Sequence, residues 1–118
     1  MPKVLVVEDE FLIMMWVEDA LRDAGYSVVT ASNADEAIDI LEGDTEVRIV
    51  FTDIDMPGSM DGLRLAAVVR DRWPPVYIIV ASGKHRPVAG EMPSEAVFLP
   101  KPYLSVDILT ALNVAARR

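Results

Sequence analysis

Five short apolar runs alternate along the chain with longer stretches in which apolar residues recur at every third or fourth position. Short apolar runs are typical of strands buried in a parallel sheet, and the periodic stretches are typical of amphipathic helices. The alternation therefore predicts an α/β domain in which helices flank one parallel sheet. We expect strands at residues 3–7, 27–31, 48–53, 76–81 and 96–99.

Capping residues predict where the helices begin and end. Gly25 is a C-terminal stop for the first helix, and Asn33 with Glu36 forms a variant of the capping box at the start of the second. The prolines at 74 and 75 end the third helix, and Ser105 caps the last one. We expect helices at residues 10–24, 34–41 and 62–72 and from residue 105 onwards.

Residues 84–94 depart from this alternation. They lie between the fourth and fifth expected strands and contain Pro87, Gly90 and Pro93, which disfavour a regular helix of three turns. We therefore expect a loop or at most one helical turn. The helix that the alternation would place between the fourth and fifth strands, the fourth in chain order, is thus short or irregular.

Four expected strands run directly into polar side chains, which are Glu8 and Asp9, Asp53, Ser82 and Lys101. Because the C-terminal ends of parallel strands meet at one edge of the sheet, we expect these side chains to lie together. Three carboxylates placed together repel one another unless a cation binds between them, and Mg²⁺ prefers such oxygen ligands.

The expected metal ligands follow from this arrangement. Asp9 and Asp53 are predicted to bind Mg²⁺ directly, Glu8 through a water molecule, and Asp55 through its backbone carbonyl. The cation would neutralise charge on an incoming phosphoryl group while Asp53 attacks in line to give an acyl phosphate.

Lys101 and Ser82 complete the expected chemistry. Lys101 is predicted to contribute a point charge to the phosphoryl oxygens, and the Ser82 hydroxyl is predicted to hydrogen-bond another of these oxygens.

Composition narrows the function classes further. The 118 residues suffice for one domain, and no apolar run approaches the ~20 residues of a membrane-spanning helix. The chain has no cysteine, which excludes disulfides and thiolate-ligated metals, and its net charge of −8 argues against nucleic-acid binding. With Met1-Pro2-Lys3 leading straight into a strand, we expect no signal peptide, a cytoplasmic location and no membrane contact.

Four motifs stand in a fixed order along the chain: VLVVEDE at 4–10, FTDIDMP at 51–57 followed by Asp61 and Gly62, ASG at 81–83, and FLPKPY at 98–103. In these motifs the chain resembles the receiver domain of two-component response regulators, over essentially its whole length. The resemblance implies a flavodoxin-like (βα)5 fold with doubly wound strand order 2-1-3-4-5, a single domain over 1–118 and a cis bond between Lys101 and Pro102.

The resemblance also implies site roles and partners. Asp53 would be the phosphoacceptor, Glu8 and Asp9 the acidic pair, and Ser82 and Lys101 the family's hydroxyl and lysine. The cofactor would be Mg²⁺ and the phosphodonor a histidine kinase or histidine phosphotransferase. Such a domain is not an enzyme beyond assisting its own phosphorylation and dephosphorylation. We expect a monomer or a weak phosphorylation-dependent dimer, acting as a stand-alone regulator or excised from a larger protein.

Phe98 occupies the family's aromatic switch position. Phosphorylation is expected to draw Ser82 inward and so make room for the Phe98 ring to rotate. Two departures from the family pattern are visible. First, Asp53 and Gly62 are one residue further apart than usual, and Gly58 and Ser59 are expected to absorb the additional residue. Second, the segment before Phe98 is shorter than usual and is expected to lack the helix that forms part of the family's output surface.

The first helix is apolar on more than one face. Its core face is expected to comprise Ile13, Val17, Ala20 and Ala24. Some of Leu12, Met15 and Trp16 should then be exposed beside the acidic site, either to contact the helical bundle that carries the phosphodonor histidine or to pack against the last helix.

Other interpretations stay open from the sequence. Asp55 and Lys84 either form a lid pair that hinders the hydrolytic water or are two solvated side chains. The strand ending in Asp53 and Asp55 also resembles the nucleophile motif of haloacid-dehalogenase-type phosphatases, although a later acidic pair is lacking. A receiver-like binding module that works without phosphorylation is the remaining alternative.

Overall fold

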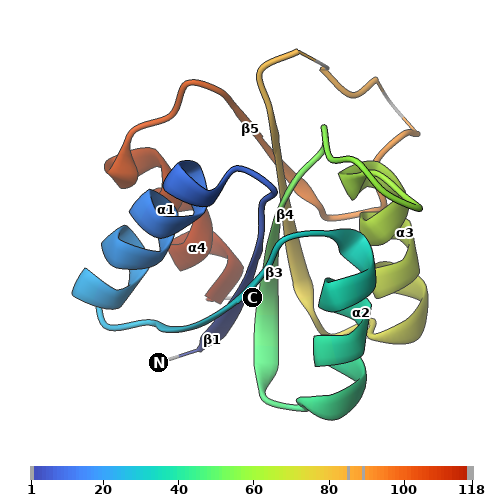
Figure 1. Ribbon diagram of the computed structural model, residues 1–118, viewed down its shortest axis with the longest axis horizontal. Coiled ribbons are helices and arrows are strands. Elements are labelled where there is room, and N and C mark those ends of the chain that lie inside the picture. Colours follow the sequence, from blue (N-terminus) through green and yellow to red (C-terminus); the bar gives the residue numbers. More distant parts are fainter. Residues whose placement is uncertain (1, 85, 89, 117–118) are drawn as a thin grey trace.

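The computed structural model describes residues 2–84, 86–88 and 90–116 (Figure 1). Five parallel strands form one sheet in the order β2-β1-β3-β4-β5, which confirms the expected doubly wound arrangement. The strands are β1 (Lys3–Val7), β2 (Ser27–Ala31), β3 (Val47–Asp53), β4 (Tyr77–Ser82) and β5 (Val97–Pro100). The helices are α1 (Phe11–Asp23), α2 (Ala34–Gly43), α3 (Gly62–Arg72) and α4 (Ser105–Ala116).

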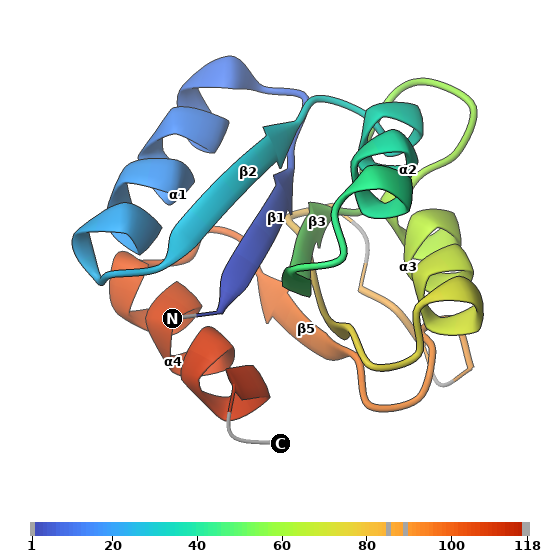
Figure 2. The same ribbon diagram turned by 90° about the horizontal axis from the view of Figure 1, so that it is seen from below.

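Two helices cover each face of the sheet (Figures 1 and 2). Alternate residues of the central strands point to opposite faces, so Val4 and Val6 pack beneath α1 and α4 whereas Leu5 and Val7 pack beneath α2 and α3. All four side chains are fully buried, which explains why this strand has an uninterrupted apolar sequence. No helix within the described ranges is both long enough and apolar enough to span a membrane.

The caps predicted at Gly25 and Asn33 are confirmed. The cap predicted at Ser105 is wrong, because Ser105 is the first residue of α4 and the Leu104 N–H before it donates to the Asp107 carboxylate at 2.8 Å. Gly25 adopts φ of 96°, a left-handed conformation that favours glycine, and its N–H donates to the carbonyl of Arg22 at 2.9 Å. The Asn33 side chain accepts a hydrogen bond from the N–H of Glu36 at 2.9 Å. The Glu36 carboxylate in turn accepts from the N–H of Ser32, one residue before the cap, which fixes the entry to α2.

The segment between β4 and β5 contains no helix in its described residues, as predicted; residues 85 and 89 lie outside the described ranges. Two backbone hydrogen bonds, Glu91 N–H to Val88 O at 3.0 Å and Ala96 N–H to Pro93 O at 3.2 Å, shape its turns. Met92 and Ala96 pack against the apolar core on the α2–α3 face. An irregular segment therefore helps to cover the part of the sheet face next to α3.

The core face of α1 differs from the prediction at its C-terminal end. Val17 and Leu21 are buried and Ile13 and Ala20 are half-buried, but Ala24 is exposed. Ala24 is the C-cap residue, where the chain leaves the helix axis, so the prediction for Ala24 is wrong. Leu21, four residues after Val17, occupies the core position that had been expected for Ala24.

Candidate functional site

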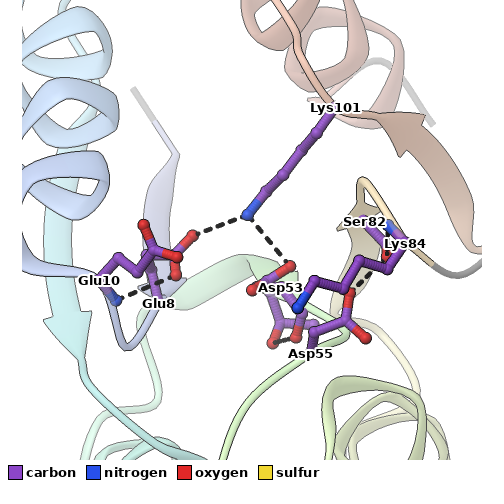
Figure 3. A network of polar contacts seen from close by, with 8 residues as sticks. Glu8, Glu10, Asp53, Asp55, Ser82, Lys84 and Lys101 are labelled. Atoms are coloured by element: carbon purple, nitrogen blue, oxygen red, sulfur yellow. Dashed lines mark hydrogen bonds and ion pairs between the residues drawn. The ribbon is translucent and has the colours of Figure 1, made fainter.

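The C-terminal ends of β1, β3, β4 and β5 bring the predicted polar residues together (Figure 3). The parallel register pairs Val7 with Thr52, Asp53 with Ala81, and Ser82 with Pro100, so that each polar side chain follows at nearly the same height. Glu8, Asp53 and Ser82 are buried, Lys101 is half-buried and Asp9 is exposed.

Gly62 positions the loop that follows Asp53. A Cβ atom on Gly62 would lie 2.0 Å from the backbone oxygen of Asp53, so no larger residue fits without a backbone shift. The Gly62 N–H donates to the carbonyl of Ile54 at 2.9 Å. Gly58 in this loop has φ of 111°, a conformation that favours glycine; that it absorbs the additional residue stays a prediction.

Lys101 bridges the two buried carboxylates. Its Nζ lies 3.3 Å from Glu8 Oε1 and 3.3 Å from Asp53 Oδ1. Burial lowers the pKa of Lys101, but the charges of Asp53 and Glu8 outweigh this and leave it above its ordinary value. The lysine thus supplies positive charge at the point where the strand ends bring negative charge together.

Burial raises the pKa of both carboxyl groups. Burial raises the pKa of Glu8 to about 7. Two contacts oppose this by lowering the pKa: the hydrogen bond that Glu8 accepts from the Glu10 N–H at 3.1 Å, and the charge of Lys101. Burial also raises the pKa of Asp53; Lys101 opposes this, whereas Asp55 and Asp9 add to it. The single lysine therefore does not fully compensate the acidic cluster.

The donor set fits a hard divalent cation. Carboxylate oxygens of Glu8, Asp9 and Asp53 lie within 4.8 Å of one another. Asp53 Oδ1 is buried and accepts no hydrogen bond from any described residue, its contact with Lys101 being an ion pair. Clustered carboxylate oxygens with a free lone pair are what Mg²⁺ prefers. The part assigned to the Asp55 carbonyl stays a prediction.

Ser82 is held by hydrogen bonds to both sides. Its hydroxyl donates to Asp55 Oδ2 at 2.6 Å and accepts from the N–H of Lys84 at 3.2 Å. The described residues include no ion pair between Asp55 and Lys84, so the structure lends no support to a lid pair. The bond between Ser82 and Asp55 was not predictable from the sequence, because it depends on the conformation of the loop after β3.

Tyr103 is a further site residue that the sequence analysis did not single out. Its ring stacks on Trp16 with centroids 5.9 Å apart and meets Phe51 edge-on at 5.9 Å. Its hydroxyl is buried and has no hydrogen-bond partner among the described residues. Burial first, and then the charges of Glu8 and Asp53, raise the pKa of this hydroxyl. Its place directly after Lys101 and Pro102 was the available signal.

The exposed side of α1 lies next to this stack. Leu12 is 80% exposed, and Met15 and Trp16 retain 42% and 44% exposure. A hollow of about 390 Å³ opens beside Trp16 and Tyr103 and reaches the stem of Lys101; Ile13, Gly83 and Pro102 complete its lining. Trp16 thus packs on Tyr103 and still presents nearly half of its surface to solvent.

Phe98 is half-buried and packs against the core on the α2–α3 face. The Arg86 guanidinium lies 5.4 Å from the centroid of its ring, a favourable contact between a cation and an aromatic face. The bond between Lys101 and Pro102 is cis, as predicted.

Comparison with known proteins decides the family. The family model of the response regulator receiver domain matches residues 4–113. The chain belongs to this family. It is accordingly a receiver domain of two-component response regulators, a signalling domain that is generally not enzymatic, and the phosphatase and phosphorylation-independent alternatives are not favoured.

The relatives support this at moderate identity. The chain is 37% identical over 93% of its length to the sensor kinase CckA of Brucella abortus, and 34% identical over 98% to the response regulator FleR of Pseudomonas aeruginosa. A response regulator receiver protein from Sinorhizobium medicae has a crystal structure that superposes with a TM-score of 0.90 at 29% identity, covering 98% of this chain and 94% of that one.

The chain spans only a small part of the length of these two relatives. The alignments span 12% of the CckA chain and 24% of the FleR chain. What transfers from these proteins is therefore the receiver domain, not the activity of the whole protein.

Proposed function

We propose that Asp53 of this receiver domain accepts a phosphoryl group from the phosphohistidine of a histidine kinase or histidine phosphotransferase. The observation that supports this is the ion pair of Lys101 with both Glu8 and Asp53 beside a cluster of three carboxylates. Together these groups provide a nucleophile, a site for a divalent cation and a fixed positive charge, which is what phosphoryl transfer requires.

The transfer forms one P–O bond and breaks one P–N bond. A carboxylate oxygen of Asp53 attacks phosphorus in line with the P–N bond of the donor, this bond breaks, and the donor imidazole leaves with its electron pair. The product is an acyl phosphate on Asp53. Mg²⁺, when held by Glu8, Asp9, Asp53 and the Asp55 carbonyl, would neutralise charge on the transferred group. Lys101 then exchanges its contact with Asp53 for a phosphoryl oxygen.

The switch is proposed to use Ser82 and Phe98. Once the Ser82 hydroxyl turns to a phosphoryl oxygen, Phe98 gains room to rotate into the core, away from Arg86. The exposed residues Leu12 and Met15, with Trp16, are proposed to contact the phosphodonor protein. The domain would act in the cytoplasm as a monomer or a weak phosphorylation-dependent dimer on a protein target.

Labelling with a small phosphodonor tests the central assignment. Phosphoramidate, which carries a P–N bond, should add one phosphoryl group to the wild type in the presence of Mg²⁺, as seen by intact mass. Asp53→Asn should abolish the labelling because the amide is not a nucleophile, and Asp9→Asn should slow it roughly tenfold or more by weakening cation binding.

Asp19→Asn is the matched control, since this exposed aspartate on α1 lies outside the carboxylate cluster, and it should be labelled like the wild type. Undiminished labelling of Asp53→Asn would contradict the assignment of the nucleophile. A wild type that is never labelled would instead favour a binding module that works without phosphorylation.

A further inference from the structure

The hydroxyl of Ser82 is already engaged in a hydrogen bond before any phosphoryl group arrives. Ser82 is 3% exposed, donates to Asp55 Oδ2 at 2.6 Å and accepts from the Lys84 N–H at 3.2 Å (Figure 3). A serine hydroxyl carries a single proton. While that proton is donated to Asp55, it cannot be donated to a second acceptor.

The Asp55 carboxylate lies near the phosphoacceptor Asp53. It follows Asp53 by two residues, and its charge is one of the causes, after burial, that raise the Asp53 pKa. Its other side faces solvent, since the residue as a whole is exposed. Asp55 can therefore swing away from Ser82 without leaving a buried charge unpaired.

The two acceptors are of similar kind. A hydroxyl bonds more strongly to an anionic oxygen than to a neutral one, and both the Asp55 carboxylate and a phosphoryl group on Asp53 are anionic. Phosphorylation must break one charge-assisted bond at Ser82 in order to form another. The net gain from the Ser82 hydroxyl is accordingly smaller than it would be without Asp55.

We propose that the Asp55 carboxylate competes with the phosphoryl group for the Ser82 hydroxyl and thereby favours the unphosphorylated conformation of the domain. Asp55 acts as a positioning residue, through Ser82 and not on phosphorus. This inference rests on the proposed function, because it assumes that Asp53 carries the phosphoryl group. It assigns to the Asp55 side chain a role separate from that of its backbone carbonyl.

A double-mutant cycle separates this mechanism from simple charge repulsion. The readout is the dissociation constant of beryllium fluoride, a phosphoryl mimic, at saturating Mg²⁺. Asp55→Ala should tighten binding roughly fivefold to tenfold, because the Ser82 proton becomes available. Asp55→Asn should tighten binding less, because its amide oxygen still accepts the Ser82 bond without a full charge.

The same Asp55→Ala change is then made in a Ser82→Ala background. There its effect should shrink to about twofold or less, because the hydroxyl in dispute is gone. An equal effect in both backgrounds would overturn the proposal and assign the effect to repulsion alone. Glu10→Gln, which removes an exposed charge near the site, should change binding to the same small extent in both backgrounds.

Two further outcomes are distinguished by the same samples. If wild type binds beryllium fluoride and is labelled by phosphoramidate but Asp55→Ala does not tighten binding, only the competition is wrong. If wild type neither binds the mimic nor is labelled, the proposed function fails and this inference fails with it. Thermal melting of each variant shows that it is folded, and the conservative Asp55→Asn change provides the comparison if Asp55→Ala is not.

Discussion

Close backbone packing around Asp53 determines how precisely its carboxylate is placed. The carbonyl oxygen of Asp53 lies 2.0 Å from the position that a Cβ of residue 62 would take, and the N–H of Gly62 donates to the carbonyl of Ile54. The end of β3 is therefore held against the first turn of α3. The absence of a side chain at residue 62 is a requirement of the site, although Gly62 itself takes no part in the chemistry.

Gly62→Ala should consequently be strongly destabilising. Its Cβ would lie 2.0 Å from a backbone oxygen, so either the end of β3 or the start of α3 must move. We expect a loss of about 2–4 kcal/mol in the free energy of unfolding, measured by urea denaturation, together with weakened Mg²⁺ binding.

Gly43→Ala is the matched control. An added Cβ at this last residue of α2 meets nothing within 4 Å, and alanine is the better helix former. It should leave stability unchanged or raise it by up to about 1 kcal/mol. Similar losses in the two variants would show that the contact with Asp53 is not what limits residue 62.

At the scale of residues, the sequence allowed prediction of those groups whose position follows from strand register. Glu8 and Lys101 directly follow β1 and β5, and Asp53 and Ser82 end β3 and β4, so the sheet itself brings them together. Bonds that depend on loop conformation were not predictable. The bond from Ser82 to Asp55 requires the loop after β3 to return toward β4, which no local pattern encodes.

At the scale of elements, α1 links the acidic site to the molecular surface. It begins two residues after Asp9, and its Trp16 stacks on Tyr103, which follows Lys101 by two residues. We therefore expect a movement of Lys101 on cation binding to change the surroundings of Trp16. Trp73, the second tryptophan, lies under Arg72 at the C-terminal end of α3, away from the carboxylates.

Single-tryptophan variants should show this difference. In Trp73→Phe, which keeps Trp16, the fluorescence emission should change on titration with Mg²⁺, because a cation bound by the carboxylates should weaken the ion pair of Lys101 with Asp53. In Trp16→Phe, which keeps Trp73, the emission should stay constant over the same range. A response carried by Trp73 alone would contradict the coupling of α1 to the site.

Element boundaries were predictable to within two residues, the largest difference being at the end of α2, which extends to Gly43. The sequence placed β4 at 76–81, whereas it spans Tyr77–Ser82, since apolar composition marks a strand but not its hydrogen bonds. The face of α1 was correct at Val17 and wrong at Ala24, where the helix has already ended. The described residues of the 84–94 segment form no long helix, as expected, because two prolines restrict the backbone conformation locally.

At the scale of the whole molecule, the fold gathers like charges at the C-terminal edge of the sheet. The chain has a net charge of −8, and the sheet places three of its carboxylates within 4.8 Å of one another. Strand order was predicted from the resemblance of the four motifs to the receiver domain, and the sheet confirms it. The strength of the repulsion among these carboxylates was not predictable, since it depends on how deeply each carboxylate is buried.

The burial of Glu8 within this acidic cluster predicts an unusual dependence of stability on pH in the absence of divalent cations. The Glu8 carboxyl has a pKa of about 7 in the folded protein and an ordinary value of 4.5 when unfolded, so the folded state holds its proton more tightly. The resulting stabilisation is complete below about pH 4.5 and is lost as pH rises through about 7. Between pH 5 and 8 the free energy of unfolding should fall, on the order of 2 kcal/mol, in urea denaturation with a chelator present.

Glu8→Gln should abolish most of this decline, because the amide stays neutral throughout the range. Glu46→Gln, an exposed change at the opposite end of the sheet, should leave the decline in place, since Glu8 is retained. Adding Mg²⁺ should reverse the slope, because the cation binds the deprotonated carboxylates of the folded state and stabilises it more at pH 8 than at pH 5. Stability that rises from pH 5 to 8 without Mg²⁺ would show that Glu8 is already charged in the cation-free protein, and that Lys101 alone balances the acidic cluster.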